Sequence, residues 1–307
     1  MAEQKITADY CYINDAMGWP DGLYVADNYK VCNTKSICIK KRCEYATLRG
    51  ECYKDADECS SRLYRDLLHI WNEDNSLKLD KFNLIDNKGV RLSCDYIGPS
   101  KAWAHYIGMK DKEIGEFLLG ARTIGGHILW PVHCIPTMNT ARAGGASLFD
   151  RIDLALYEIR RFYLNEDRKS KFPQVLWSVL QKDIEKNFLL GFSGYKYGED
   201  AFKAFVDFWL LQDFVVDYEK GDYSVVSLAT SEDNMRNKVS ENEPVFPGNN
   251  ELFRYWKDIV AGNMPKEKKI VLCNAYKKYV KNLLCVIERR NERIIEREKQ
   301  RDIKSST

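Results

Sequence analysis

One stretch of the chain gathers residue types that bind phosphate groups. Residues 123–145 hold two glycine pairs, and Asn139, Thr140 and Arg142 among them offer an amide, a hydroxyl and a guanidinium. Glycine-rich backbone exposes N–H groups, and one guanidinium can bind two oxygens of a phosphate. A helix that begins directly after such a loop adds the positive end of its dipole. The stretch therefore predicts a phosphate or pyrophosphate site. An ordinary strand-to-helix turn is the alternative, because neither P-loop nor dinucleotide-fingerprint spacing is present.

Further candidate residues flank this loop. Gly125 and Gly126 would let a flat ligand approach the backbone, and Arg122 and His127 beside them would orient a nucleotide. A histidine in a strand is also common in protein cores, so His127 has a structural interpretation as well. Glu158 follows the loop, in the next expected helix, where its carboxylate is a candidate general base or ribose acceptor.

The elements that must position these residues follow from hydrophobic periodicity. Residues 127–135 are typical of a short buried strand that a proline interrupts, and residues 147–163 of a helix capped by Ser147. On that helix Arg151, Leu154, Glu158 and Arg161 share one face, at successive spacings of three, four and three residues, and the charges on it favour surface salt bridges. Before this region, the turn residues 86–89 predict a β-hairpin.

A buried helix is expected over residues 201–217, because this segment is apolar on nearly every face. Its carboxylates, Asp207 and Asp213, need partners, since an unpaired buried charge is costly. We expect Arg160 or Arg161 of the earlier helix to pair with them.

The last expected element is a long helix that begins near Pro265 and continues toward Arg301. Its final part is a run of charged residues, which favours a solvated helix tail. The chain is therefore expected to be an α+β protein, with a mixed sheet flanked by helices, a cysteine-rich N-terminal arm and a long C-terminal helix. Residues 1–60 would form the arm and residues 61–301 the main domain.

The composition is that of a folded globular protein. The 307 residues are 45% hydrophobic and carry a net charge of only +2, so no global field indicates nucleic acid or membrane as a partner. The N-terminal residues have no apolar core of a signal peptide, and no run of apolar residues is long enough to cross a membrane. We therefore expect a cytoplasmic protein without a membrane partner.

The chain has ten cysteines, five of them between Cys32 and Cys59. Zinc sites usually offer cysteines in pairs two to four residues apart. Here Cys38 and Cys43 are separated by four residues, but the other gaps are wider and no histidine lies nearby. Reduced thiols are therefore the favoured interpretation, with a structural zinc site as the alternative and no metal expected at the functional site.

Five motifs occur in an order that resembles an uncharacterised bacterial family, a domain of unknown function. They are RTIGGHILWP, TMNTARAGG, DRIDLALYEIRRFY, AFVDFWLLQDFV and RRNERI, and they span about residues 60–295. The chain departs from that family's pattern at Trp130 and at Ala143, and its cysteine-rich arm lies outside the pattern. It is thus similar to a divergent member.

More loosely, the chain resembles toxin components of bacterial anti-phage operons, some of which are ADP-ribosyltransferases. That resemblance implies NAD as a substrate, RNA or protein as the target, RNA being favoured, and an antitoxin or chaperone as a possible partner. Such enzymes follow an early arginine with a Ser/Thr strand and a Glu-x-Glu pair. Arg122, the segment VVSLATS and Glu243 occur in this order. Glu158 or Glu243 would then supply the catalytic carboxylate, with His127 orienting the nucleotide and Arg142 binding its pyrophosphate.

Two other functions fit the same sequence. In a metal-independent ribonuclease toxin, His127 and His133 would serve as acid and base and Arg142 would clamp the phosphate. In a non-catalytic module that senses a phage component or docks an antitoxin, the basic end of the C-terminal helix would matter most. Its arginines are Arg289, Arg290, Arg293, Arg297 and Arg301.

Overall fold

The structure is a computed structural model that describes a large part of the second half of the chain and short parts of the first half. The described residues are 92–98, 108–110, 112–113, 117, 121, 124–131, 151–167, 169, 177, 180–181, 183–232, 235–244 and 265–305. In chain order they form β1 (Leu92–Tyr96), η3 (Ile124–Gly126), β2 (His127–Pro131), α7 (Ile152–Tyr163), α9 (Asp183–Phe192), α10 (Glu199–Trp209), η4 (Gln212–Phe214), β3 (Val215–Asp217), β4 (Asp222–Val225) and α12 (Lys266–Ser305).

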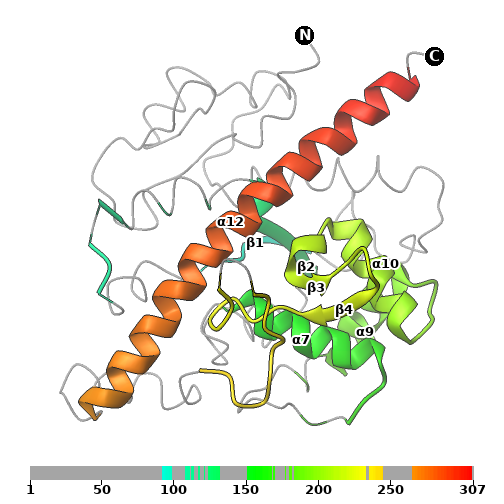
Figure 1. The fold of residues 1–307 in the computed structure, drawn as a ribbon. Helices are drawn as coiled ribbons and strands as arrows, with labels where there is room; N and C mark the ends of the chain where they lie inside the picture. Colours follow the sequence, from blue (N-terminus) through cyan, green and yellow to red (C-terminus); the bar gives the residue numbers. More distant parts are fainter. Residues whose placement is uncertain are drawn as a thin grey trace.

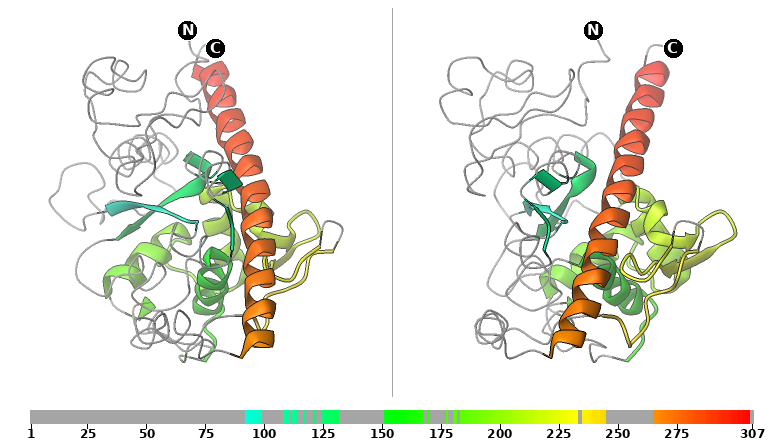
Figure 2. Two further views of the ribbon diagram at one scale, coloured as in Figure 1. Left: turned by 90° about the vertical axis from the view of Figure 1, so that its left-hand side faces the viewer. Right: turned by 60° about the vertical axis from the view of Figure 1, so that its left-hand side comes forward.

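The longest element is α12, whose 40 residues extend about 60 Å at the usual rise per residue. It crosses the described part of the molecule as a single rod (Figure 1). The helices α7, α9 and α10 and the β3–β4 hairpin lie beside its N-terminal and middle parts, and its last turns extend past them (Figure 2). One side of α12 is therefore covered by elements from distant parts of the sequence.

Strands pair in two separate antiparallel sheets of two strands each, among the described residues. In the first, β1 pairs with β2 so that Leu92 lies opposite Pro131 and Tyr96 opposite His127. In the second, β3 and β4 form a hairpin whose turn contains Gly221, at a φ of +78°. A left-handed backbone of this kind favours glycine, which explains the residue at this turn.

The core between the helices is largely aromatic. The ring of Phe192 on α9 packs against Phe205, Phe208 and Trp209 on α10, with ring centroids 4.8 to 5.7 Å apart. α10 begins with Glu199 and Asp200, which suit the positive end of the helix dipole. It ends where Leu210 adopts a left-handed conformation at a φ of 55°. The chain then turns directly into η4 and β3.

Two predictions from the sequence are confirmed. The fold is α+β, and a long helix begins directly after Pro265, at Lys266, and continues to Ser305. The described strands pair only antiparallel, and the cysteine-rich arm lies outside the described residues, as does the predicted hairpin turn at 86–89.

Two predictions of helix boundaries were wrong. The segment 201–217 is not one helix, because α10 ends at Trp209 and the residues from Val215 enter a hairpin. α7 begins at Ile152, later than a helix capped by Ser147 would, and the side chain of its N-cap residue Arg151 makes no capping hydrogen bond.

The predicted ion pairs between these helices were also wrong. Asp207 pairs with Lys203 at 2.5 Å, and Asp213 pairs with arginines of α12. Arg160 and Arg161 instead pair with Glu199 and Glu158 respectively. Asp207 and Arg161 therefore have partners one helical turn away, whereas Asp213 and Arg160 have partners 80 and 39 residues away, other than those that the sequence predicted.

Candidate functional site

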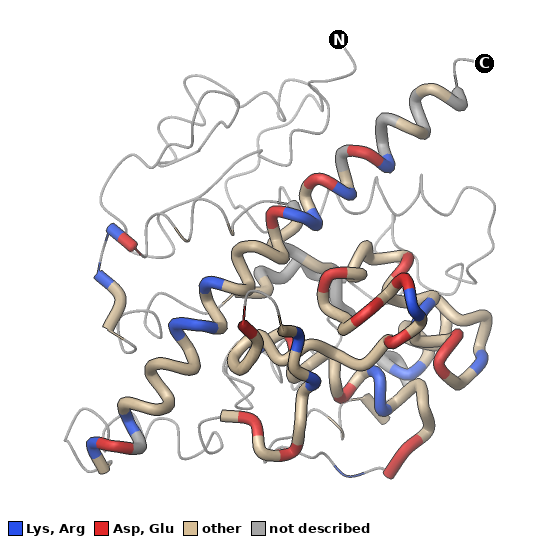
Figure 3. Tube along the Cα trace, in the orientation of Figure 1, with Lys and Arg blue, Asp and Glu red and all other residues tan. Residues whose placement is uncertain are grey.

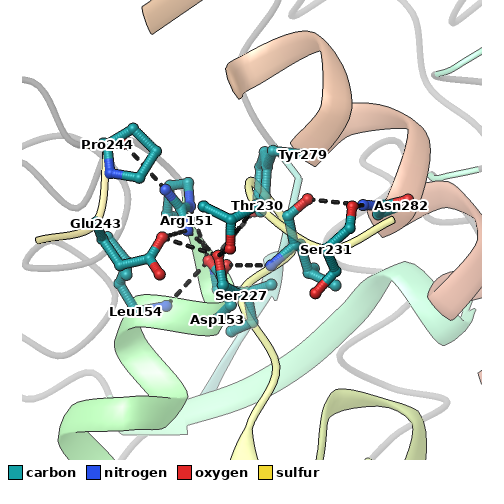
Figure 4. Close-up of polar contacts among 12 residues, drawn as sticks. Arg151, Asp153, Leu154, Ser227, Thr230, Ser231, Glu243, Pro244, Tyr279 and Asn282 are labelled. Carbon is teal, nitrogen blue, oxygen red and sulfur yellow. Dashed lines mark hydrogen bonds and ion pairs between the residues drawn. The ribbon is translucent and has the colours of Figure 1, made fainter. Parts of the chain in front are cut away.

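A polar cluster is buried where α7 begins, and we call it the Arg151 cluster. Its members are Arg151, Asp153, Ser227, Thr230 and Glu243, which come from three segments of the chain (Figure 4). The side chains of Arg151 and Asp153 are 0% exposed and that of Glu243 is 1% exposed. Such a group must satisfy its own hydrogen bonds, because water does not reach it.

The centre of the cluster is a two-pronged pair between Arg151 and Asp153. Arg151 donates from Nε to Oδ1 of Asp153 at 2.9 Å and from Nη2 to Oδ2 at 2.6 Å. The same carboxylate accepts the backbone N–H groups of Leu154 at 3.0 Å and Leu228 at 2.8 Å. Asp153 therefore joins the first turn of α7 to the segment that follows β4.

Glu243 is the second carboxylate on the same guanidinium. Its Oε2 accepts from Nη2 of Arg151 at 3.1 Å and from the hydroxyl of Ser227 at 2.9 Å. Its Oε1 accepts the backbone N–H of Ser240 at 3.3 Å, and Arg151 also donates to the carbonyl of Pro244 at 3.0 Å. The turn at 240–243 and the guanidinium together fix the position of this carboxylate.

The hydroxyl groups come from a tight turn after β4. Thr230 donates its hydroxyl to Oγ of Ser227 at 2.8 Å, and Ser231 donates its N–H to the carbonyl of Ser227 at 3.0 Å. Asn237 donates its side-chain amide to the carbonyl of Thr230 at 2.8 Å. Within this turn Ser227 accepts from the hydroxyl of Thr230 and the N–H of Ser231, and its own hydroxyl donates to Glu243.

α12 closes the cluster from the other side. The hydroxyl of Tyr279 accepts the N–H of Ile152 at 3.1 Å, and the guanidinium carbon of Arg151 lies 5.1 Å from the centre of the Tyr279 ring. Asn282 donates its amide to the carbonyls of Leu228 at 2.8 Å and of Ser231 at 3.1 Å. The last helix thus holds both the start of α7 and the serine-threonine turn.

The electrostatics of the cluster are dominated by its single cation. Burial alone would lower the pKa of Arg151, but the charge and hydrogen bonds of Asp153 outweigh it and raise the pKa above its ordinary value. One guanidinium therefore faces two carboxylates out of contact with water. Chemically, the arrangement holds Glu243 in a fixed orientation between a hydroxyl and a guanidinium.

Glu243 is the one predicted site residue that the structure places in this cluster. Glu158 lies seven residues beyond Arg151 on α7, about two helical turns away. It is fully buried, and its Oε2 accepts from Arg161 at 3.0 Å. The expectation that this helix face carries surface salt bridges was wrong, because Arg151, Glu158 and Arg161 are all buried.

The glycine pair has a clear structural role. Gly125 donates its N–H to Oδ1 of Asn291 at 2.7 Å and accepts from Arg290 at 2.7 Å, so α12 packs directly against this backbone. A Cβ on Gly125 would lie 2.5 Å from that oxygen of Asn291, and one on Gly126 would lie 1.6 Å from the carbonyl oxygen of Ala121. Atoms of α12 therefore occupy the space next to Gly125.

The other predicted site residues are not placed. His127 lies at the start of β2, but the structure describes only its backbone. Arg122, Asn139, Thr140 and Arg142 lie outside the described residues, as does His133. Binding of a nucleotide by the 123–145 loop therefore stays a prediction.

The sequence contained a partial signal for the residues that the prediction missed. The segment VVSLATS and Glu243 stood out as a Ser/Thr segment followed by a Glu-x-Glu pair. Arg151 and Asp153 looked like members of an ordinary ionic helix face, because spacing alone does not distinguish a buried face from an exposed one.

The basic end of α12 is engaged with the rest of the fold. Arg290 is buried and donates to the carbonyls of Trp209 and Gly125, at 2.9 and 2.7 Å. Arg293 donates to Asp213 at 2.8 Å, and Arg297 donates to the carbonyl of Phe208 at 3.5 Å. Arg290 and Arg297 thus cap C-terminal carbonyls of α10, whereas Arg293 binds the side chain of Asp213 in η4. The expected solvated helix tail was wrong for the buried Arg290, but Arg289 and Arg293 are exposed.

Comparison with known proteins identifies the family. A family model described as "Family of unknown function (DUF6994)" matches residues 43–294. The chain belongs to this family. The match begins inside the expected cysteine-rich arm, so the DUF6994 domain includes part of residues 1–60. No curated protein and no solved structure matches the chain.

The described parts of the DUF6994 domain also bear on metals and membranes. Within the residues that the structure describes, no group of three or more His, Cys, Asp or Glu side chains is arranged to hold a metal ion. None of the described helices is long and apolar enough to cross a membrane.

Proposed function

We propose that this DUF6994 protein transfers an ADP-ribosyl group from NAD to a macromolecule, with Glu243 as the catalytic carboxylate. The observation that supports this is the meeting of Arg151, Ser227 and Glu243 within hydrogen-bond distance. They follow one another along the chain as an arginine, a Ser/Thr segment and a Glu-x-Glu pair. In the proposal Arg151 takes the place that the sequence gave to Arg122, because Arg151 contacts Glu243.

The proposed reaction breaks the bond between C1′ of the ribose and the nicotinamide nitrogen. The bond electrons leave with neutral nicotinamide, and C1′ forms a bond to a nucleophilic oxygen or nitrogen of the target, which loses a proton. Positive charge develops on the ribose in the transition state, and a fixed carboxylate stabilises such charge. Glu243 would supply this carboxylate, while Ser227 and Arg151 hold its orientation.

The proposal requires the cluster to open. Because the side chain of Glu243 is 1% exposed, a ribose reaches it only if the segment around 240–244 moves away from α7. Among the described residues, the backbone–backbone hydrogen bond of that turn runs from the N–H of Glu243 to the carbonyl of Ser240 at 3.2 Å. A site that opens on binding excludes water from the reaction once it has closed again.

The test uses purified protein, bacterial lysate and NAD labelled in its adenylate half. The expected result is label in macromolecules with the wild-type chain, and loss of label with Glu243→Gln, which keeps the size of the side chain. Glu219→Gln is the matched control, because Glu219 is an exposed residue of the β3–β4 turn and lies outside the Glu-x-Glu pair. Digestion with ribonuclease or protease then shows whether RNA, which we favour, or protein carries the label.

Two results would overturn the proposal. If no label is transferred, or if Glu243→Gln transfers as much as wild type, the Arg151 cluster serves the fold alone. Shortened lysate RNA without label would favour the ribonuclease. Thermal melting of each variant separates loss of catalysis from loss of folding. As an anti-phage toxin, the wild-type chain would also arrest growth when expressed in bacteria, and Glu243→Gln would relieve the arrest.

A further inference from the structure

A second charged cluster lies at the surface, on the side of α12 that faces η4. Three arginines share one carboxylate there, and we call them the Asp213 arginines. Arg293 donates from Nε to Oδ2 of Asp213 at 2.8 Å, while Arg289 and Arg236 approach Oδ1 at 3.5 and 3.6 Å. Asp213 balances only one of the three positive charges.

The guanidinium groups are accessible, unlike the carboxylate between them. The side chains of Arg289, Arg293 and Arg236 are 55%, 42% and 36% exposed, whereas that of Asp213 is 9% exposed. Arg236 also donates to the carbonyl of Val215 at 2.8 Å, which fixes its position. Asp213 therefore holds the three cations together at the surface.

The neighbouring acidic residues limit the shape of an anion that fits. Glu288, Glu292 and Glu296 are exposed on α12, and no ion pair within the described residues joins them to the Asp213 arginines. Along the C-terminal half of α12 the acidic and basic residues alternate (Figure 3). An extended polyanion on this helix would meet repulsion on either side of the cluster, whereas a compact one would not.

We propose that the Asp213 arginines form a binding site for a compact phosphate group, free or carried by a small nucleotide. A guanidinium binds phosphate oxygens through paired hydrogen bonds, and three of them provide a charge that matches a di- or trianion. Asp213 competes with the anion for the same donors. This site is independent of the Arg151 cluster and of the proposed transfer reaction.

The proposal predicts that removing an arginine and removing Asp213 change the affinity for phosphate in opposite directions. Removing an arginine removes a charge-assisted contact, so Arg293→Gln is expected to weaken pyrophosphate binding about tenfold. Removing the competing carboxylate with Asp213→Asn is expected to strengthen it severalfold. The control is Lys220→Gln, since Lys220 is 83% exposed, pairs with Asp217 and lies outside the cluster.

The measurement is isothermal titration calorimetry of the full chain with sodium pyrophosphate, and in parallel with AMP, at low salt. Binding of both shows that the phosphate group is recognised, and binding of pyrophosphate alone shows that the free polyphosphate is the ligand. No saturable binding of either would overturn the proposal. So would binding that Arg293→Gln leaves unchanged in a variant whose melting temperature matches wild type, or binding of long RNA alone.

Discussion

Replacing Arg151 by methionine would leave two carboxylates buried without their cation. Asp153 would keep its two backbone N–H donors, and Glu243 would keep Ser227 and the N–H of Ser240, but both would lose the cation that pairs with them in the described part of the chain. Breaking a buried ion pair from one side costs about 3–5 kcal/mol of the free energy of unfolding. For a domain of this size that corresponds to a fall in melting temperature of about 6–20 °C.

The matched control for this prediction is Arg160→Met on the same helix. Arg160 pairs with Glu199, whose side chain is 45% exposed, so its loss is expected to cost less than about 1 kcal/mol. Urea unfolding of the wild type and both variants measures the difference.

The dependence on pH gives a second check. Without Arg151 the two buried carboxylates lose their counter-charge, and burial of an unpaired charge is costly. Acid neutralises that charge and so relieves the cost in the folded variant. The loss in free energy of unfolding caused by Arg151→Met is therefore expected to become smaller as the pH is lowered from about 8 to about 5. Equal costs for the two variants, or a deficit that does not change with pH, would refute the reasoning.

Three further predictions concern other parts of the fold. Gly125→Ala is expected to destabilise the protein by about 1–3 kcal/mol. Adding Asn291→Ala should restore only part of this stability, because a backbone carbonyl of α12 also lies 2.6 Å from the new Cβ. Full recovery of the melting temperature in the double variant would contradict the close packing. Iodoacetamide should modify Cys285 before Cys273, because Cys285 is exposed whereas burial raises the pKa of the Cys273 thiol. Mass spectrometry of the native protein measures both rates of modification, and equal rates would count against the burial of Cys273. Arg161→Met should speed amide hydrogen exchange in the loop after α7, since Arg161 donates to the carbonyls of Asp167 and Lys169 at 3.0 and 2.9 Å. Unchanged exchange in this loop would refute the prediction.

The elements that the sequence predicted well are those with a strong period and a clear boundary. The helix over α12 was predicted closely, because its apolar line is regular and Pro265 marks its start. The segment 201–217 was misread as one helix, because residues that are apolar on every face carry no period. Gly221, in the turn shortly after it, was the available sign of a hairpin.

The candidate site was predictable only in part. Glu243 and the serine-threonine turn stood out as residue types in the sequence, but Arg151 did not, because its partners lie 2 and 92 residues away. For the same reason the basic run of α12 was read as solvated: its acceptors include the carbonyl of Trp209, 81 residues earlier. Residue patterns show which groups need partners, but not which distant backbone atoms supply them.

The contacts of α12 have a consequence for how the protein is made. Of the described elements, α12 is synthesised last, yet Arg290 and Asn282 on it satisfy carbonyls of Gly125, Trp209 and Leu228. Until this helix has left the ribosome, those carbonyls lack the donors that α12 supplies, and the apolar surface that α12 covers stays exposed. Contacts between residues so far apart in sequence also slow folding. The nascent chain therefore passes through a period in which it depends on chaperones or risks aggregation, and only the completed helix ends that period.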